Sequence, residues 1–154
     1  MTYELKLERM IDATPEVVFD TLIDPEAQPE IFAGQVPGWE LWEVTIDPRV
    51  GGAWNFVFGP ADRSGQPDHS ESVFIEIDRP RRISHRASMF IGDWGRAVDL
   101  TETITFEDRD GKTLVTIVLT DLETEEIRDG FKDGVPGYLE AIDRVATARI
   151  ADRS

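Results

Sequence analysis

Apolar side chains recur at every second residue in a series of short runs through the middle of the chain. This period is expected of strands that bury one face, because successive side chains in a strand point to opposite sides. The alternating members are Trp42, Val44 and Ile46; Trp54, Phe56 and Phe58; Val73, Ile75 and Ile77; Ile83, His85, Ala87 and Met89; Leu100, Glu102, Ile104 and Phe106; and Val115, Ile117 and Leu119. A similar run over residues 3–11 comes before them. The pattern predicts a first strand and then a six-stranded antiparallel meander that buries these residues.

Short segments of turn-forming residues separate the predicted strands. Gly51-Gly52 comes directly before the aromatic run that starts at Ala53, and glycine suits a corner that other residues enter only with strain. Asp108-Arg109-Asp110-Gly111 has the composition of a hairpin connection. Arg79-Pro80-Arg81-Arg82 is a local basic cluster, and its proline favours a turn over an anion site.

Helical spacing occurs in two regions. Thr14-Pro15-Glu16 has a cap residue, a proline and an acid in the order that opens a helix, and a second short helix is expected over residues 26–32. Near the C-terminus, apolar residues recur at mostly three- and four-residue steps: Ile127, Phe131, Val135, Tyr138, Ile142, Val145 and Ile150. Pro136 lacks a backbone donor, so we expect a kink or break near residues 132–136 and a firm helix from Pro136 to Ile150.

Composition narrows the class of protein. The chain has 154 residues, of which 40% are hydrophobic, and this predicts one domain over residues 1–154. It lacks a run of about 18 apolar residues and a secretory signal pattern, so we expect a cytoplasmic protein. A formal net charge of −15 opposes binding to phosphate backbones and anionic membranes, so we expect neither nucleic acid nor a membrane as a partner. The absence of cysteine excludes disulfides, thiol catalysis and cysteine-ligated zinc.

The order of these elements, with several local motifs, resembles a known family. The motifs are Asp47-Pro48 before Gly51-Gly52, residues 76–83 around Pro80, Thr103-Ile104-Thr105-Phe106-Glu107-Asp108 with Gly111 and Thr113, and the segment from Gly134 to Val145. Together they resemble the activator of Hsp90 ATPase homologue 1-like (AHSA1-like) branch of the START-like, or SRPBCC, superfamily. Two positions depart from that pattern. Pro29-Glu30-Ile31-Phe32 stands where many relatives carry Arg-Trp-Trp, and Arg79 stands where relatives often carry a second proline.

The resemblance implies an α+β helix-grip (START-like or Bet v 1-like) fold, in which a curved antiparallel sheet wraps around a long C-terminal helix. It also implies a cavity that binds a small hydrophobic or aromatic molecule between the sheet and that helix. An enzyme of the aromatase or cyclase type, using the same cavity, is the alternative. An Hsp90 regulator is a weaker one, because the chain has no room for the separate chaperone-binding domain of the eukaryotic activators.

Twelve residues are candidates to line such a cavity, and each could equally be an ordinary core contact. They are Trp54, Phe56, Phe58, Ile75, His85, Met89, Leu100, Glu102, Ile104, Phe131, Tyr138 and Ile142. Glu102 interrupts an apolar face, so it orients a ligand, pairs with an arginine such as Arg86 or Arg96, or lies at a strand end that splays into water. His85 is similarly placed, and Asn55 and Tyr138 are further candidates to orient a ligand.

Catalytic and metal chemistry have no motif in the sequence. There is no nucleophile elbow, zinc-protease signature, phosphate loop or dinucleotide fingerprint, so we name no catalytic residue and no cofactor. His69 lies near Asp68 and Glu71, but a solvated loop explains this better than a metal site. A homodimer through a strand edge or an aromatic loop stays open, with Trp39 and Trp94 as candidate contacts.

Overall fold

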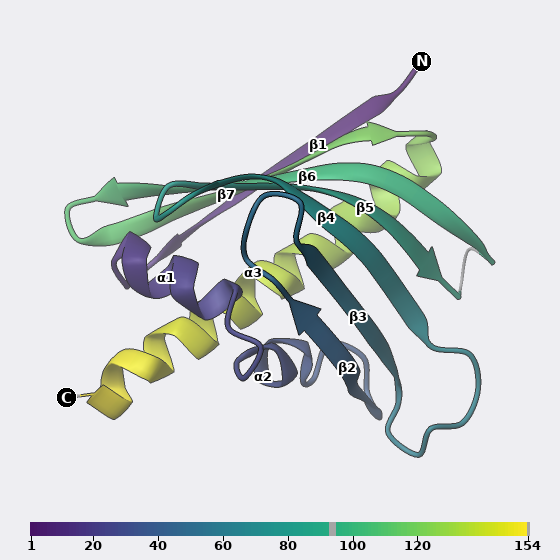
Figure 1. Ribbon diagram of the computed structural model, residues 1–154, viewed down its shortest axis with the longest axis horizontal. Coiled ribbons are helices and arrows are strands. Elements are labelled where there is room, and N and C mark those ends of the chain that lie inside the picture. The colour runs from purple at the N-terminus through teal and green to yellow at the C-terminus, as the bar shows by residue number, and fades with distance from the viewer. Residues whose placement is uncertain (93–94, 154) are drawn as a thin grey trace.

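The computed structural model describes residues 1–92 and 95–153. Its elements are β1 (Tyr3–Ile11), α1 (Pro15–Leu22), α2 (Gln28–Phe32), β2 (Trp39–Ile46), β3 (Ala53–Pro60), β4 (Asp68–Asp78), β5 (Arg82–Ile91), β6 (Arg96–Arg109), β7 (Lys112–Leu122) and α3 (Glu125–Arg153). A seven-stranded curved sheet grips α3, and two short helices follow the first strand (Figure 1). The predicted helix-grip fold is confirmed.

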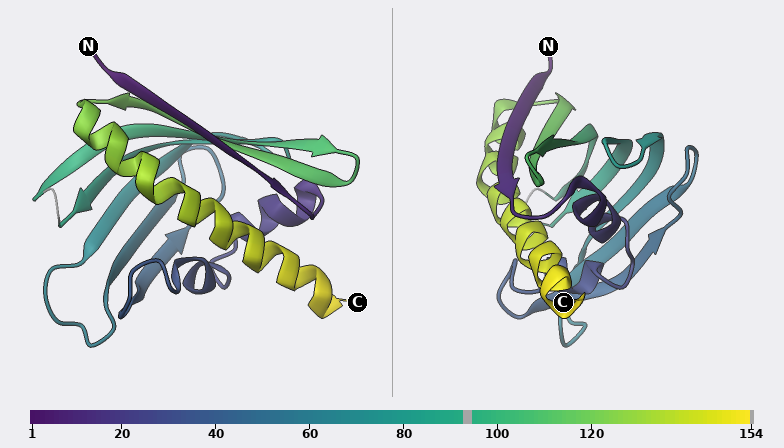
Figure 2. Two further views of the ribbon diagram at one scale, coloured as in Figure 1. Left: turned by 180° about the vertical axis from the view of Figure 1, so that it is seen from behind. Right: turned by 90° about the vertical axis from the view of Figure 1, so that its left-hand side faces the viewer.

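The sheet is an antiparallel meander of β2 to β7, with the first strand added at the β7 edge. The strand order is β1-β7-β6-β5-β4-β3-β2, so β2 to β7 pair in sequence and β1 returns beside β7. Helix α3 crosses the inner side of the sheet diagonally, and α1 and α2 lie near its C-terminal half (Figure 2). Apolar side chains from the inner face and from α3 form the core, including Phe74, Ile104, Ile117 and Ile142, each 0–1% exposed.

Glycine is required at two of the predicted corners. Gly51 has a φ of +85°, and a Cβ at Gly52 would lie 2.1 Å from the carbonyl oxygen of Asp47. Asp110 and Gly111, between β6 and β7, both have positive φ, as a two-residue hairpin turn demands. These corners set the registers of β3 and β7.

Strand β4 differs from the prediction in the face that it buries. Val73 and Ile75 are 47% and 48% exposed, whereas Phe74 between them is fully buried. The prediction that Val73 and Ile75 face inward, and that Ile75 lines a cavity, is therefore wrong. A bulge between Phe74 and Glu76 then returns Ile77 to the core side.

Helix α3 is continuous through the segment where its proline predicts a kink or break. Pro136 lies inside it, and the exposed Lys132 carries the carbonyl that a residue with an N–H would have bonded. Water can hydrate that carbonyl, while Val135 and Leu139 hold the same segment against the core. Buried contacts on one side and hydration on the other explain why the helix is not interrupted.

Candidate ligand-binding pocket

A pocket of about 190 Å³ lies between the inner face of the sheet and helices α2 and α3. Most of the residues that line it are apolar or aromatic, and a few polar side chains are placed among them. The lining consists of Gln28, Phe32, Trp54, Phe56, Ser70, Ser72, His85, Met89, Leu100, Glu102, Leu119, Phe131, Gly134, Val135 and Tyr138.

The residues from the sheet form three rows that run across neighbouring strands. Strand pairing places each residue beside the next one in its row. The rows are Phe56–Ser70–Met89, Trp54–Ser72–Ala87–Leu100 and Phe74–His85–Glu102–Leu119. Residues far apart in the sequence therefore share one wall because of the strand register.

Two serines explain why this wall is hollow. Ser70 and Ser72 lie on the inner face of β4 and are 3% and 4% exposed. Ser72 donates a hydrogen bond of 2.6 Å from its hydroxyl to the carbonyl oxygen of Trp54, which satisfies that buried group. Ser70 lies between Phe56 and Met89, and Ser72 lies between Trp54 and the small Ala87, so these small side chains leave open volume within two rows.

Aromatic rings form the side of the pocket next to α2. The ring of Phe32 lies 4.9 Å from that of Phe56 and 5.1 Å from that of Phe58, between ring centroids. Trp54 stacks on Phe74 at 5.5 Å and contacts the His85 ring at 4.9 Å. Phe32 belongs to the segment that departs from the Arg-Trp-Trp pattern, and it supplies an apolar wall there.

The main polar feature is a contact between neighbouring strands. His85 Nε2 lies 2.6 Å from Glu102 Oε1, and the two side chains are only 7% and 16% exposed. Because a carboxylate can only accept, the imidazole donates through Nε2 when Glu102 is ionised. Such a pair can hold or move a proton in the pocket.

Tyr138 of α3 faces the same group of polar residues. Burial raises the pKa of Tyr138 well above its ordinary value of 10.0, and the negative charge of Glu102 raises this pKa further. Both causes disfavour a phenolate, so Tyr138 presents a neutral hydroxyl. The same environment opposes any other anion placed beside it.

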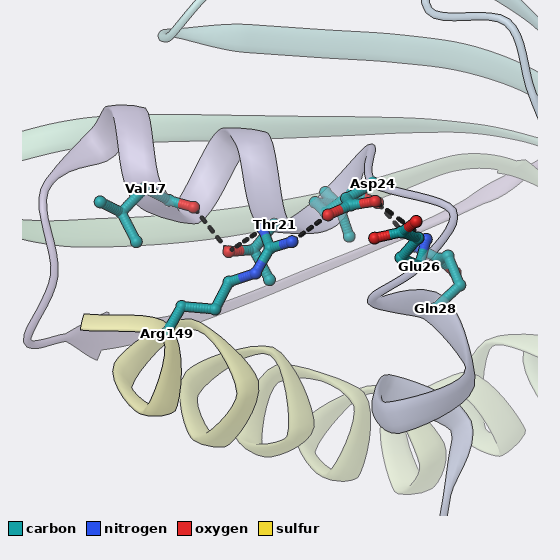
Figure 3. Close-up of polar contacts among 7 residues, drawn as sticks. Val17, Thr21, Asp24, Glu26, Gln28 and Arg149 are labelled. Carbon is teal, nitrogen blue, oxygen red and sulfur yellow. Dashed lines mark hydrogen bonds and ion pairs between the residues drawn. The ribbon is translucent and has the colours of Figure 1, made fainter. Parts of the chain in front are cut away.

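Gln28 enters the pocket from the start of α2, at a connection that α3 holds in place. Its Nε2 donates to the carbonyl oxygen of Leu22 at 2.6 Å. Figure 3 shows Arg149 reaching from α3 to Thr21 and Asp24, with Glu26 and Gln28 following in the chain. Arg149 forms an ion pair with Asp24, and Asp24 in turn accepts a hydrogen bond of 2.9 Å from the backbone N–H of Glu26. These contacts outside the pocket join α3 to the segment that leads into Gln28.

Comparison with known proteins places this geometry in a family. The family model described as "Activator of Hsp90 ATPase homolog 1-like protein" matches residues 12–147. The chain belongs to the AHSA1-like family. Its predicted membership is thus confirmed, and the match includes α1, α2, the pocket strands and most of α3.

Solved structures share the fold of this AHSA1-like chain. A protein from Chromobacterium violaceum has a TM-score of 0.77 at 23% identity, covering 93% of this chain and 96% of that one. A protein from Rhizobium leguminosarum has a TM-score of 0.77 at 22% identity, covering 96% of each. The AHSA1-like protein from Aeromonas hydrophila has a TM-score of 0.75 at 24% identity, covering 96% of this chain and 94% of that one. No curated protein sequence matches significantly.

The structure brings eight of the twelve predicted lining residues together around the pocket: Trp54, Phe56, His85, Met89, Leu100, Glu102, Phe131 and Tyr138. Four others do not line it. Ile104 and Ile142 are fully buried in the core, Phe58 packs against Phe32 and Trp39, and Ile75 is half-exposed. The first three face inward as their spacing predicts, but lie beyond the hollow.

Other residues proposed from the sequence have different contacts. Asn55 does not line the pocket, and its side-chain oxygen accepts a hydrogen bond from the backbone N–H of Ser72. Arg96 pairs with Glu123 and Arg86 is exposed, so Glu102 pairs with His85 instead of either arginine. His69 stacks on Phe90 at 5.3 Å. Trp94 lies outside the described residues, and the ring of Trp39 lies 5.3 Å from that of Phe58.

Residue-by-residue reading missed several lining residues. These are Gln28, Phe32, Ser70, Ser72, Leu119, Gly134 and Val135. The period-two pattern contained Leu119, and the helical pattern contained Val135, so both could have been proposed. The serines gave no signal, because a polar residue between apolar ones is normally assigned to the solvent face.

The described residues also bear on metal binding and on membrane insertion. Within residues 1–92 and 95–153, no three histidine, cysteine, aspartate or glutamate side chains are grouped as metal ligands would be. Over the same residues, no helix is both long enough and apolar enough to span a bilayer.

Proposed function

We propose that this AHSA1-like protein binds a small, uncharged apolar or aromatic molecule in the pocket between the sheet and α3. The observation that carries the proposal is the hollow at Ser70 and Ser72, surrounded by aromatic and aliphatic side chains. Binding sites for small molecules are commonly apolar and contain a few convergent polar groups. His85, Glu102, Tyr138 and Gln28 are the groups of that kind here.

The size of the pocket limits the ligand. Its volume of about 190 Å³ is below the range of ~300–1,000 Å³ for drug-sized ligands. An engineered cavity of ~150 Å³ is large enough to hold benzene. The pocket therefore fits one ring and a small substituent, and a larger ligand requires the surrounding side chains to move.

A filling variant with a matched control tests the proposal. Ser70→Leu places an aliphatic side chain in the hollow, whereas Ser88→Leu makes the same change at an exposed position of β5. We choose Ser70 over Ser72 because the Ser72 hydroxyl bonds the Trp54 carbonyl. NMR titration with toluene should give saturable shifts in the wild type and in Ser88→Leu, and none in folded Ser70→Leu. Equal toluene binding by Ser70→Leu would refute the proposal.

Proton-transfer catalysis in the same pocket is a second candidate function, and the 2.6 Å contact between His85 and Glu102 favours it. Native mass spectrometry of protein purified without detergent would first identify any co-purified molecule. That molecule is then incubated with the wild type and with His85→Gln. Chemical conversion by the wild type alone, with binding retained in the variant, supports catalysis, and recovery of the unchanged molecule supports binding.

A further inference from the structure

Two buried polar atoms among the described side chains have no hydrogen-bond partner, and both belong to residues of the pocket. They are Gln28 Oε1 and His85 Nδ1. Gln28 is 0% exposed and His85 is 5% exposed. Leaving such an atom unpaired costs about 1–3 kcal/mol, so buried polar atoms nearly always have a partner.

The contacts of Gln28 determine which end of its amide is unpaired. Its other terminal atom lies 2.6 Å from the Leu22 carbonyl oxygen, which only accepts hydrogen bonds. That atom must therefore be the donating nitrogen, and the unpaired atom must be the oxygen. The same argument applies to a neutral His85. Because Nε2 donates to Glu102, the unpaired Nδ1 is an acceptor.

We propose that the pocket selects a single-ring aromatic molecule with a neutral hydrogen-bond donor, phenol being the simplest, and that this donor binds Gln28 Oε1. This inference rests on the proposed function and specifies its ligand class. Aromatic side chains from the sheet and both helices line the pocket, among them Phe32, Trp54 and Phe131. These side chains can make offset-stacked and edge-on contacts with an aromatic ligand, and the volume of the pocket limits that ligand to one ring.

Charge at the pocket argues for a neutral ligand. Glu102 lies in the wall, and its charge disfavours a negative charge at Tyr138. A ligand carboxylate would face the same charge, would lose its hydration, and could not donate to Gln28 Oε1. The proposed ligand is therefore an aromatic alcohol or amine in its neutral form, and benzoate should bind weakly.

The test compares ligands that differ in one donor. Phenol, anisole and toluene have similar shapes, but only phenol donates a hydrogen bond. Calorimetry or NMR titration of the wild type should give phenol a dissociation constant about tenfold lower than that of toluene or anisole. If the pocket offered no acceptor, toluene would bind more tightly than phenol, because the phenol hydroxyl would lose its hydrogen bonds to water and gain none in return.

Gln28→Met assigns the effect to one residue. It should raise the dissociation constant of phenol about tenfold and change that of toluene by less than about threefold. Gln35→Met is the matched control. Gln35 also donates through Nε2 to backbone carbonyls, those of Ile31 and Gly137, but does not line the pocket. Gln35→Met should keep the wild-type preference for phenol.

The outcomes separate this inference from the proposed function. Toluene binding that matches or exceeds phenol binding overturns the donor proposal and leaves the apolar pocket standing. A preference for phenol that survives in Gln28→Met also overturns it, because another residue then supplies the acceptor. Absence of binding by all three ligands overturns both. If Gln28→Met does not fold, the order of the three dissociation constants measured on the wild type tests the donor proposal.

Discussion

His85 and Glu102 face each other across β5 and β6, with Nε2 and Oε1 separated by 2.6 Å in the wall of the pocket. Strand register makes them direct neighbours, and the Trp54 ring covers the imidazole from the next row. The imidazole Nε2 and the carboxylate thus satisfy each other where water has little access. Each is costly to bury alone, so both stability and ligand choice should respond to their mutation.

Removal of the carboxylate should destabilise the fold. Glu102→Ala leaves His85 Nε2 without its partner, and we expect the free energy of unfolding to fall by about 1–3 kcal/mol. Glu76→Ala removes a carboxylate from a half-exposed pair with Arg82 and should cost no more than about 0.5 kcal/mol. Urea denaturation of both variants measures the difference. Equal losses of unfolding free energy in the two variants would show that the buried pair stabilises the fold no more than the exposed pair does.

Replacement of Glu102 by glutamine should change ligand selectivity. Glu102→Gln keeps the shape of the side chain and an oxygen that can accept from His85, but removes the negative charge. The dissociation constant of benzoate should therefore fall relative to that of toluene, by about tenfold. Competition titrations on the wild type and the variant give this ratio, and an unchanged ratio across the series would remove Glu102 from ligand recognition.

Gly134 offers a site for stabilisation. It lies inside α3, and a Cβ there would have no atom within 4 Å. Gly134→Ala should raise the free energy of unfolding by about 0.5–1 kcal/mol, because alanine loses less backbone entropy in a helix. At Gly137 the added Cβ would lie 3.2 Å from Gln35 Oε1, so Gly137→Ala should gain less. Urea denaturation compares the two, and a loss of stability at Gly134 would contradict the open space there.

Arg149 should stabilise the connection that positions Gln28. Its guanidinium pairs with Asp24 and donates to Thr21 Oγ1 at 3.2 Å, joining α3 to the end of α1. Arg149→Met should lower stability by about 1 kcal/mol, and Arg149→Lys should restore only part, because an ammonium cannot match the planar fork. If the connection aligns Gln28, Arg149→Met should also lower the affinity for phenol. An unchanged affinity would show that Gln28 is held by its own bond to Leu22.

Tyr138 should make stability depend on alkaline pH. Burial, followed by the charge of Glu102, raises its pKa above 10.0 in the folded state. The folded state therefore keeps this proton at a pH where the unfolded state has lost it, and stability should decline as the pH rises above about 10. Tyr138→Phe should remove this part of the decline. Urea denaturation at several pH values up to 11 tests the slope, and measurements of the variant at pH 7 separate any packing effect.

Prediction from the sequence succeeded where the signal is local. The strands and helices follow from periods of two and three to four residues, because those periods are properties of each segment alone. The aromatic face of β3 and the corner at Gly51-Gly52 were found in the same way. The continuity of helix α3 was harder to predict from the sequence. Whether Pro136 interrupts the helix depends on what packs against Val135 and Leu139.

The amino-acid sequence was enough to predict the order and type of the elements, the inward aromatic residues and the family to which the fold belongs. The site could not be predicted in this way, because it arises from tertiary contacts. The tertiary structure turned Ser70 and Ser72 inward and Val73 and Ile75 outward, set His85 against Glu102, and brought Gln28 to the wall. Whether a polar residue faces water or a pocket depends on strand register and on neighbours more than 10 positions away. Local hydrophobic periodicity carries no information about either.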